Sequence, residues 1–248
     1  MTPAGHRLFA RYAYAPNARG YCGPREGAVL EAVACGAGDD VDVPAVARRF
    51  SGAWPYQVLI AELAGVDDPL DEAVGRAYWT GNALTGEVDA DAFGALLLER
   101  FAGQAGHYWQ HLTPDLLAEA TPTHIFHVLG VYPWTRLLAP GRPEPLEVLD
   151  GCRIRPAEVV AVEAGGLRVR TRTLRFEDGR LVLAPPAEET VSTASSHGSF
   201  TGPLAPGDAV AVHWGHACDV LTTGDVAHLE RLTDRQLALT NARLAREG

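Results

Sequence analysis

The chain contains no lysine, so all 21 of its Lys and Arg positions are arginine. This absence excludes chemistry that needs an amine side chain, such as Schiff-base formation with a carbonyl substrate. Acidic residues outnumber arginines, and the formal net charge of the 248 residues is −10 at pH 7. A nucleic-acid partner is therefore not expected, because there is no excess of cations to displace counterions from phosphates.

Long apolar runs are also missing. No stretch approaches the roughly 20 apolar residues that a helix needs to span a bilayer. Residues Met1–His6 contain no apolar core of signal-peptide length. We therefore expect a cytoplasmic protein without a membrane partner.

Cysteines are few and scattered, and Cys22, Cys35, Cys152 and Cys218 form no C-x-x-C pair. This spacing argues against a zinc knuckle, and a reducing cytoplasm argues against a disulfide framework. The chain also lacks a G-x-S-x-G elbow, a phosphate-binding loop, a dinucleotide fingerprint and an H-E-x-x-H motif. None of these catalytic or binding motifs is present, so the candidate functional residues are individual cysteines and histidines.

Helical spacing of apolar residues dominates the first 140 residues. Asp42, Asp71 and Asp89 are expected to cap three of the helices, and the Pro and Gly residues of Tyr14–Pro24 predict a loop. The predicted helices are Arg7–Ala13, Glu26–Cys35, Asp42–Phe50, Trp54–Leu63, Asp71–Trp79, Asp89–Ala102, Pro114–Ala120 and Thr123–Leu138, the last interrupted at Pro133.

The pattern changes after a proline-rich segment, Ala139–Pro145, which predicts a stiff extended linker. Alternating apolar residues then predict strands, with hairpin turns at Gly165–Gly166 and Asp178–Gly179 and a long loop with a strand inside it over Pro185–Pro203. Asp225–Arg246 has the apolar spacing of a helix. We predict an α+β protein with a helical domain at 1–140, a linker at 141–149, and a small OB-like β-barrel with a C-terminal helix at 150–248.

The segment Val210–Leu221 combines strand alternation with an unusual density of metal-binding side chains. It carries His213, His216 and Cys218. Thiolate and imidazole are good ligands for iron, nickel and zinc. A cysteine and a histidine at the ends of two neighbouring strands would supply half of a coordination sphere. The alternative is that Cys152 packs as a small hydrophobic residue and His213 is a hydrogen-bonded imidazole.

Two motifs in this half resemble the HypC/HupF family of [NiFe]-hydrogenase maturation chaperones. The first is Cys-x-x-x-Pro-x-x-Val-Val from Cys152 to Val160, and the second is Gly-Asp-x-Val-x-Val-His-x-Gly-x-Ala from Gly207 to Ala217. An acidic amphipathic helix follows in the family, similar to Asp225–Leu239. The resemblance covers about the last hundred residues.

The resemblance implies a bacterial accessory protein that carries iron with cyanide and carbonyl ligands transiently. Cys152 would supply the iron-binding thiolate, and His213 would be the residue beside it. The partners would be a hydrogenase large subunit or a second maturation factor. The family's cysteine is N-terminal, whereas Cys152 is internal. His216 and Cys218 stand where the family has apolar residues, and they are either a second ligand pair or tolerated changes.

The helical half offers a different class of function. His107 and His111 are spaced i, i+4, and His124 and His127 are spaced i, i+3, so each pair shares a helical face. Together they could form a site for haem or another transition metal in an enzyme, or they could pack against neighbouring aromatic residues. A third reading of the whole chain is a metal-free interaction module.

One further thiol stands out in the N-terminal half. Cys22 lies in a predicted turn between Arg19 and Arg25, which would lower its pKa and make it reactive; packing inward is the alternative.

The tyrosine-rich start and the segment Val131–Thr135 also resemble an uncharacterised bacterial family, from which no activity follows.

Overall fold

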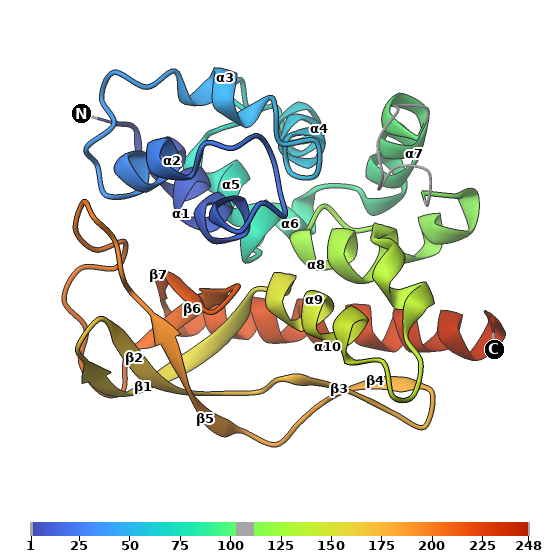
Figure 1. Cartoon of the computed structure of the whole chain (residues 1–248). Helices are drawn as coiled ribbons and strands as arrows, with labels where there is room; N and C mark the ends of the chain where they lie inside the picture. The colour runs from blue at the N-terminus through green and yellow to red at the C-terminus, as the bar shows by residue number, and fades with distance from the viewer. Residues whose placement is uncertain (1, 103–111, 248) are drawn as a thin grey trace.

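The computed structural model describes residues 2–102 and 112–247. It has a layer of helices from the N-terminal half, a β-sheet from the C-terminal half, and a long C-terminal helix that runs alongside both (Figure 1). The protein is therefore a mixed α+β fold, as the sequence predicts. Within the described residues, no helix combines the length and apolar character needed to cross a membrane.

The N-terminal helices begin where local signals place them. The side chains of Asp42, Asp71 and Asp89 each accept a hydrogen bond from a backbone N–H in the first turn of the helix that follows. These caps confirm the predicted starts, because they satisfy donors that have no partner inside the helix. The helices are α1 (Ala4–Ala18), α2 (Gly27–Ala34), α3 (Val43–Ala47), α4 (Trp54–Ala64), α5 (Glu72–Trp79), α6 (Ala83–Glu87) and α7 (Ala90–Phe101).

Two predictions about this half are wrong in detail. Helix α1 continues through Pro16 to Ala18, so the first part of the predicted loop Tyr14–Pro24 is helical. The predicted helix Thr123–Leu138 is divided into α8 (His124–Phe126), a π-helical turn (His127–Val131) and a 3₁₀ turn (Pro133–Leu137). Tyr132 is extended before Pro133, as the proline ring requires of the residue that precedes it.

The predicted proline-rich linker is not an extended crossing. Its last three residues begin helix α9 (Pro143–Cys152), with Pro143 in the first turn. Proline is tolerated at that position because its missing N–H would have no partner inside the helix, and its fixed φ suits a helix start. Cys152 is the last residue of α9 and not the beginning of a strand.

The sheet consists of five strands: β1 (Arg155–Glu163), β2 (Gly166–Thr171), β5 (Ala187–Ser192), β6 (Ala209–His213) and β7 (His216–Leu221). The pairs β1–β2, β1–β6, β2–β5 and β6–β7 are antiparallel, whereas β5 and β7 meet only at Ser192 and His216. A separate hairpin is formed by β3 (Leu174–Glu177) and β4 (Arg180–Leu183), with its turn at Asp178–Gly179 as predicted. The strand β5 also confirms the strand predicted inside Pro185–Pro203.

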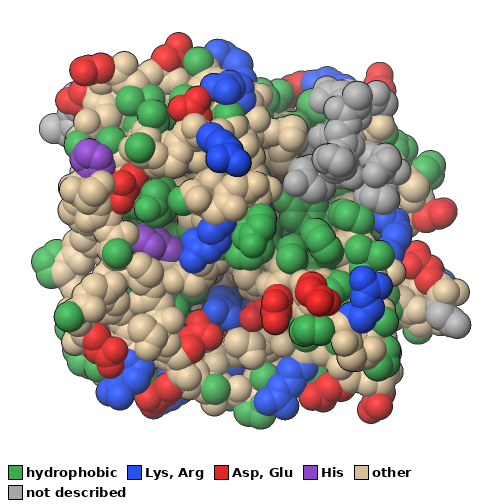
Figure 2. Space-filling model, in the orientation of Figure 1, with side chains coloured by type: hydrophobic (Ala, Val, Ile, Leu, Met, Phe, Trp, Pro, Cys, Tyr) green, Lys and Arg blue, Asp and Glu red, His purple; other side chains and the backbone are tan. Residues whose placement is uncertain are grey.

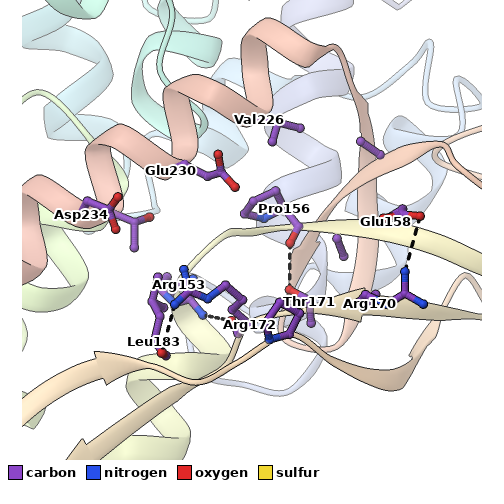
Figure 3. Close-up of a pocket in the computed structure, with 14 residues that line it drawn as sticks. Arg153, Pro156, Glu158, Arg170, Thr171, Arg172, Leu183, Val226, Glu230 and Asp234 are labelled. Carbon is purple, nitrogen blue, oxygen red and sulfur yellow. Dashed lines mark hydrogen bonds and ion pairs between the residues drawn. The ribbon is translucent and has the colours of Figure 1, made fainter.

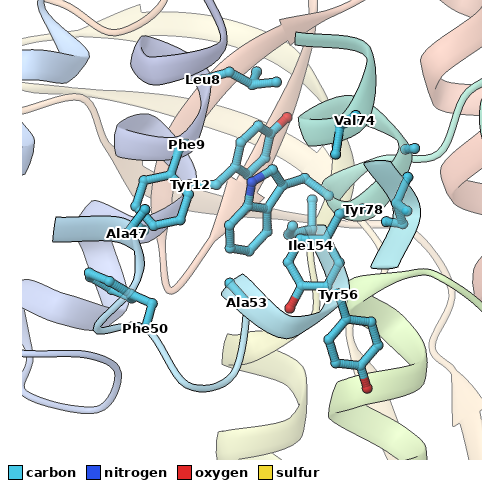
Figure 4. Packing of buried hydrophobic residues seen from close by; sticks show 14 of the residues in the cluster. Leu8, Phe9, Tyr12, Ala47, Phe50, Ala53, Tyr56, Val74, Tyr78 and Ile154 are labelled. Atoms are coloured by element: carbon cyan, nitrogen blue, oxygen red, sulfur yellow. The ribbon is translucent and has the colours of Figure 1, made fainter. Parts of the chain in front are cut away.

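The main hydrophobic core joins the two halves of the chain. It includes Leu8, Tyr56 and Val74 from the helices, and also Ile154, Ala211 and Leu229 from the second half. Figure 4 shows Ile154 among aromatic and apolar side chains of the helical layer. The C-terminal helix α10 (Thr223–Glu247) strengthens this connection, because its Arg243 side chain pairs with Glu119 and donates to the carbonyl oxygen of Leu129.

Candidate metal centre

The strand register brings Cys152 close to His213. Strands β1 and β6 pair antiparallel with Arg155 opposite Val212. The residues just before β1 and the last residue of β6 therefore lie at the same edge of the sheet. The backbone N–H of Trp214 also donates to the carbonyl oxygen of Gly151 at 2.8 Å, which ties the end of α9 to the β6–β7 turn.

A third candidate ligand comes from the helical half. His124, the first residue of α8, places its ring nitrogen Nε2 4.0 Å from the Cys152 sulfur, and its ring lies edge-on to the His213 ring with centroids 5.2 Å apart. One nitrogen of each imidazole and the sulfur all lie within 4.8 Å of one another. Among the residues that the structure describes, this is the one cluster of His, Cys, Asp or Glu suited to hold a metal ion.

Burial keeps both imidazoles in the state that binds metals. His124 and His213 are 5% and 1% exposed. Burial lowers the pKa of His213 to about 4, and burial together with the neighbouring His213 and His127 lowers the pKa of His124 well below its usual value. Both rings are therefore neutral at pH 7, which metal ligation requires.

The tautomer of His213 is set by the first helix. Nδ1 of His213 donates to the backbone carbonyl oxygen of Tyr12 at 2.8 Å. In the neutral ring this leaves the lone pair on Nε2, and Nε2 has no hydrogen-bond partner among the described residues. Metal-binding histidines are commonly oriented in this way by a carbonyl on the other nitrogen.

Burial raises the pKa of the Cys152 thiol, and the nearby thiol of Cys22 raises it further. Without a cation the thiol is therefore protonated at neutral pH. A bound metal ion would reverse this preference, because a coordinated thiol loses its proton.

The separation of the three donors fits a small transition-metal ion. In a tetrahedral zinc-type site, nitrogen and sulfur ligands at bond lengths near 2.1 and 2.3 Å lie about 3.6 Å apart. The donors of His124, Cys152 and His213 are within 4.8 Å of one another, so closing on an ion needs movements of about 1 Å at most. Three protein ligands leave a tetrahedral ion one open position.

The triad of His124, Cys152 and His213 lines a cavity of about 380 Å³ between the helical layer and the sheet. Phe50, Tyr78, Trp79, Tyr132, Trp134 and Trp214 contribute aromatic side chains to its wall. Figure 4 shows Phe50, Ala53 and Tyr78 of this wall on the helical side. The described lining contains no Asp, Glu or Arg.

Trp214 is held over the end of α9 by an unusual backbone. It has φ +51° and Gly215 has φ +70°, so the two-residue turn between β6 and β7 uses left-handed conformations that are costly for a tryptophan. A Cβ on Gly151 would lie 2.8 Å from the Trp214 ring. Gly151 therefore allows the indole to pack against the helix beside Cys152.

Two other predicted residues line the same cavity without joining the triad. Nδ1 of His127 lies 3.3 Å from the Tyr56 hydroxyl, and burial lowers the pKa of His127 to about 3. Cys22 also faces the cavity, whereas the sequence predicts a thiol activated by neighbouring arginines. Burial of the sulfur raises its pKa to about 12, because the turn directs the thiol inward.

The remaining predicted ligands lie elsewhere. The ring of His216 packs against Tyr14 and Phe200, and the thiol of Cys218 donates to the backbone carbonyl oxygen of His216 within the main core. Neither belongs to the triad. His107 and His111 lie outside the described residues.

A second cavity, of about 460 Å³, lies between the sheet and α10 (Figure 3). Its wall is charged, but its arginines are engaged within the protein. Arg153 donates to the Asp150 carboxylate and to the carbonyl oxygen of Arg172, and the Arg172 guanidinium donates to the carbonyl oxygens of Leu183 and Ala184. No set of metal ligands converges among the described residues there.

The face of the molecule shown in Figure 2 carries hydrophobic side chains near its centre, with arginines and acidic side chains below them.

A family model described as a family of unknown function (DUF6390) matches residues 1–247. No curated protein and no solved structure matches the chain.

Proposed function

The chain therefore belongs to a family of unknown function, DUF6390, and we propose that it holds and carries a transition-metal fragment for the assembly of another protein's metal centre. Cys152 and His213 are the ligands in this proposal, and His124 is the third. The observation that carries it is the convergence of a thiol and two neutral imidazoles in one cavity. The cargo would be iron with cyanide and carbonyl ligands, destined for a [NiFe]-hydrogenase-type centre.

Three features of the site support a carrier. The donor set of one sulfur and two nitrogens suits borderline metals such as iron and zinc. Three protein ligands leave room for ligands that travel with the ion. The uncharged wall of the cavity has no carboxylate that could act as a general base, and it suits small uncharged ligands such as carbon monoxide.

The link to hydrogenase assembly rests on the two motifs that resemble the HypC/HupF family, which contain Cys152 and His213. The resemblance also implies a fold, and we propose that the five-stranded sheet corresponds to that family's OB-like barrel. The partners would then be a hydrogenase large subunit or a second maturation factor. His124 lies outside both motifs and would be a ligand particular to this chain.

The experiment is co-expression of the chain with hydrogenase-assembly proteins, followed by iron analysis and infrared spectroscopy. We expect bound iron with cyanide and carbonyl bands, both lost in Cys152→Ala. Cys218→Ala is the matched control, because it removes a buried thiol outside the cavity. Cys152→Ser, with folding checked by circular dichroism, separates lost ligation from lost structure. Iron and infrared bands unchanged in folded Cys152 variants would contradict the proposal.

The second candidate is a metal-dependent enzyme at the same site. Three protein ligands and an open position also describe a catalytic zinc site, in which the ion would activate a bound water beside His127. Metal that stays bound in the presence of assembly partners would favour the enzyme. Metal that transfers to a partner favours the carrier.

A further inference from the structure

The cavity is larger than a metal ion and its smallest ligands require. A water molecule takes about 30 Å³ in the liquid, so one water or one diatomic ligand on the ion would fill a small part of the 380 Å³. The volume instead falls within the roughly 300–1,000 Å³ typical of sites that bind small organic molecules.

The wall has the composition of such a site. Tyr78 and Trp79 come from α5, Trp134 comes from the 3₁₀ turn before α9, and Trp214 comes from the turn between β6 and β7. The indole N–H of Trp79 is buried and has no hydrogen-bond partner among the described residues. Aromatic walls favour a flat apolar molecule, and an unpaired donor favours a ligand with an acceptor atom.

The cavity has a buried inner end and an exposed outer end. Its metal ligands are buried, whereas Tyr21, on the loop after α1, lines the same cavity and is 55% exposed. Val148, one turn before Cys152 on α9, is half-buried and also lines it. A molecule entering past Tyr21 and Val148 would meet the triad with its leading atom and the aromatic wall with its body.

We propose that this cavity binds a small, uncharged aromatic molecule that places one nitrogen or oxygen donor on the open position of the metal. The inference rests on the proposed metal site and adds a second class of ligand, besides cyanide and carbon monoxide, for its open position. It follows from the convergence of three metal ligands and four large aromatic side chains around one uncharged space. A molecule whose charge lies away from the ion, against the aromatic wall, is disfavoured, because nothing in the described lining compensates that charge.

The test uses the full chain loaded with Co²⁺, whose visible absorption bands report the ligands of the ion. The probes are imidazole, 4-phenylimidazole and 4-(imidazol-4-yl)benzoate. We expect 4-phenylimidazole to bind about tenfold to a hundredfold more tightly than imidazole, because its phenyl ring leaves water for the aromatic wall. The benzoate, whose charge would lie against the aromatic wall, should bind more weakly than 4-phenylimidazole. Equal affinity for imidazole and 4-phenylimidazole would overturn the inference.

A variant that fills the outer cavity provides the control. Val148→Trp should leave the Co²⁺ bands unchanged and remove the advantage of 4-phenylimidazole, and Ala53→Leu tests the same point from the helical side. An advantage that survives in both folded variants would place the phenyl ring elsewhere and contradict the proposal.

Titration of the metal-free chain separates this inference from the metal site. Quenching of tryptophan emission by 4-phenylimidazole, lost in Val148→Trp, would support the cavity even if Co²⁺ failed to bind. Absence of Co²⁺ binding would contradict the proposed metal function alone. Absence of quenching together with equal affinities on the Co²⁺ protein would contradict the aromatic ligand alone.

Discussion

Nδ1 of His213 donates to the carbonyl oxygen of Tyr12 at 2.8 Å, across a separation of 201 residues in the sequence. This contact joins the first helix to the end of strand β6 and sets which nitrogen of His213 can bind a metal. The candidate metal centre therefore depends on both halves of the chain, and the N-terminal helices are part of it.

The first prediction concerns the packing of Gly151 against Trp214. Gly151→Ala should destabilise the protein by about 1–3 kcal/mol, because the new methyl group would overlap the indole. Urea denaturation of the variant measures this loss. In a Trp214→Gly background the same change should be neutral or stabilising by up to about 1 kcal/mol, since alanine favours a helix. An equal loss in both backgrounds would show that the indole is not the cause.

The second prediction concerns the buried ion pair that joins α10 to the helical half. Arg243 and Glu119 are 3% and 4% exposed at their side chains and 2.7 Å apart. Arg243→Met should cost about 3–5 kcal/mol in the free energy of unfolding, because it leaves the carboxylate buried without its partner. The double variant Glu119→Gln with Arg243→Met should be more stable than Arg243→Met alone. The reverse order would contradict this account of the pair.

The third prediction is a dependence of stability on pH from His216. Burial lowers its pKa to about 4, whereas an unfolded histidine has a pKa near 6.5. Between these values the unfolded chain binds more protons than the folded one. The contribution is therefore complete above pH 6.5 and is lost as the pH falls toward 4, amounting to about 3 kcal/mol.

Comparison with His216→Phe isolates this effect, because phenylalanine keeps a ring beside Tyr14 and Phe200 without a titrating group. Chemical denaturation at pH 7 and pH 4 should show a smaller loss of stability in the variant. Parallel losses in both proteins would mean that His216 is not protonated on unfolding.

The fourth prediction concerns the Cys22 thiol. Its pKa of about 12 predicts alkylation by iodoacetamide at pH 8 at least a hundredfold slower than for a small unhindered thiol, because little thiolate is present. Mass spectrometry of the labelled peptide measures the rate in the native protein. Labelling in urea should restore the ordinary rate, and rapid labelling of the native chain would instead place the thiol in solvent.

The elements that the sequence predicts well are those with local causes. Asp71 and Asp89 cap their helices through contacts within a few residues, and the turn at Asp178–Gly179 follows from its own backbone preferences. The helix at Pro143–Cys152 was not predicted, because the prolines in this segment are incompatible with a helix interior. They are nevertheless compatible with the first turn of a helix, which is where this helix begins.

The candidate site could be predicted only in part, for a physical reason. Cys152 and His213 were expected to meet because both flank strands that the motifs place together. His124 was grouped with other helical histidines, since its spacing from His127 is a local signal and its contact with Cys152 is not. The sequence does indicate that His124 is buried, because it lies within a densely apolar segment. Burial alone does not identify the residue that His124 contacts.

The most direct test of the metal centre is X-ray absorption spectroscopy of the chain loaded with one equivalent of Zn²⁺ or Co²⁺. The account predicts one sulfur and two imidazole nitrogens around the ion, with a lighter ligand in the fourth position. Sulfur should disappear in Cys152→Ala, and one imidazole should disappear in His124→Ala. An ion without sulfur in the unaltered chain, or a sulfur ligand that persists in Cys152→Ala, would contradict the account.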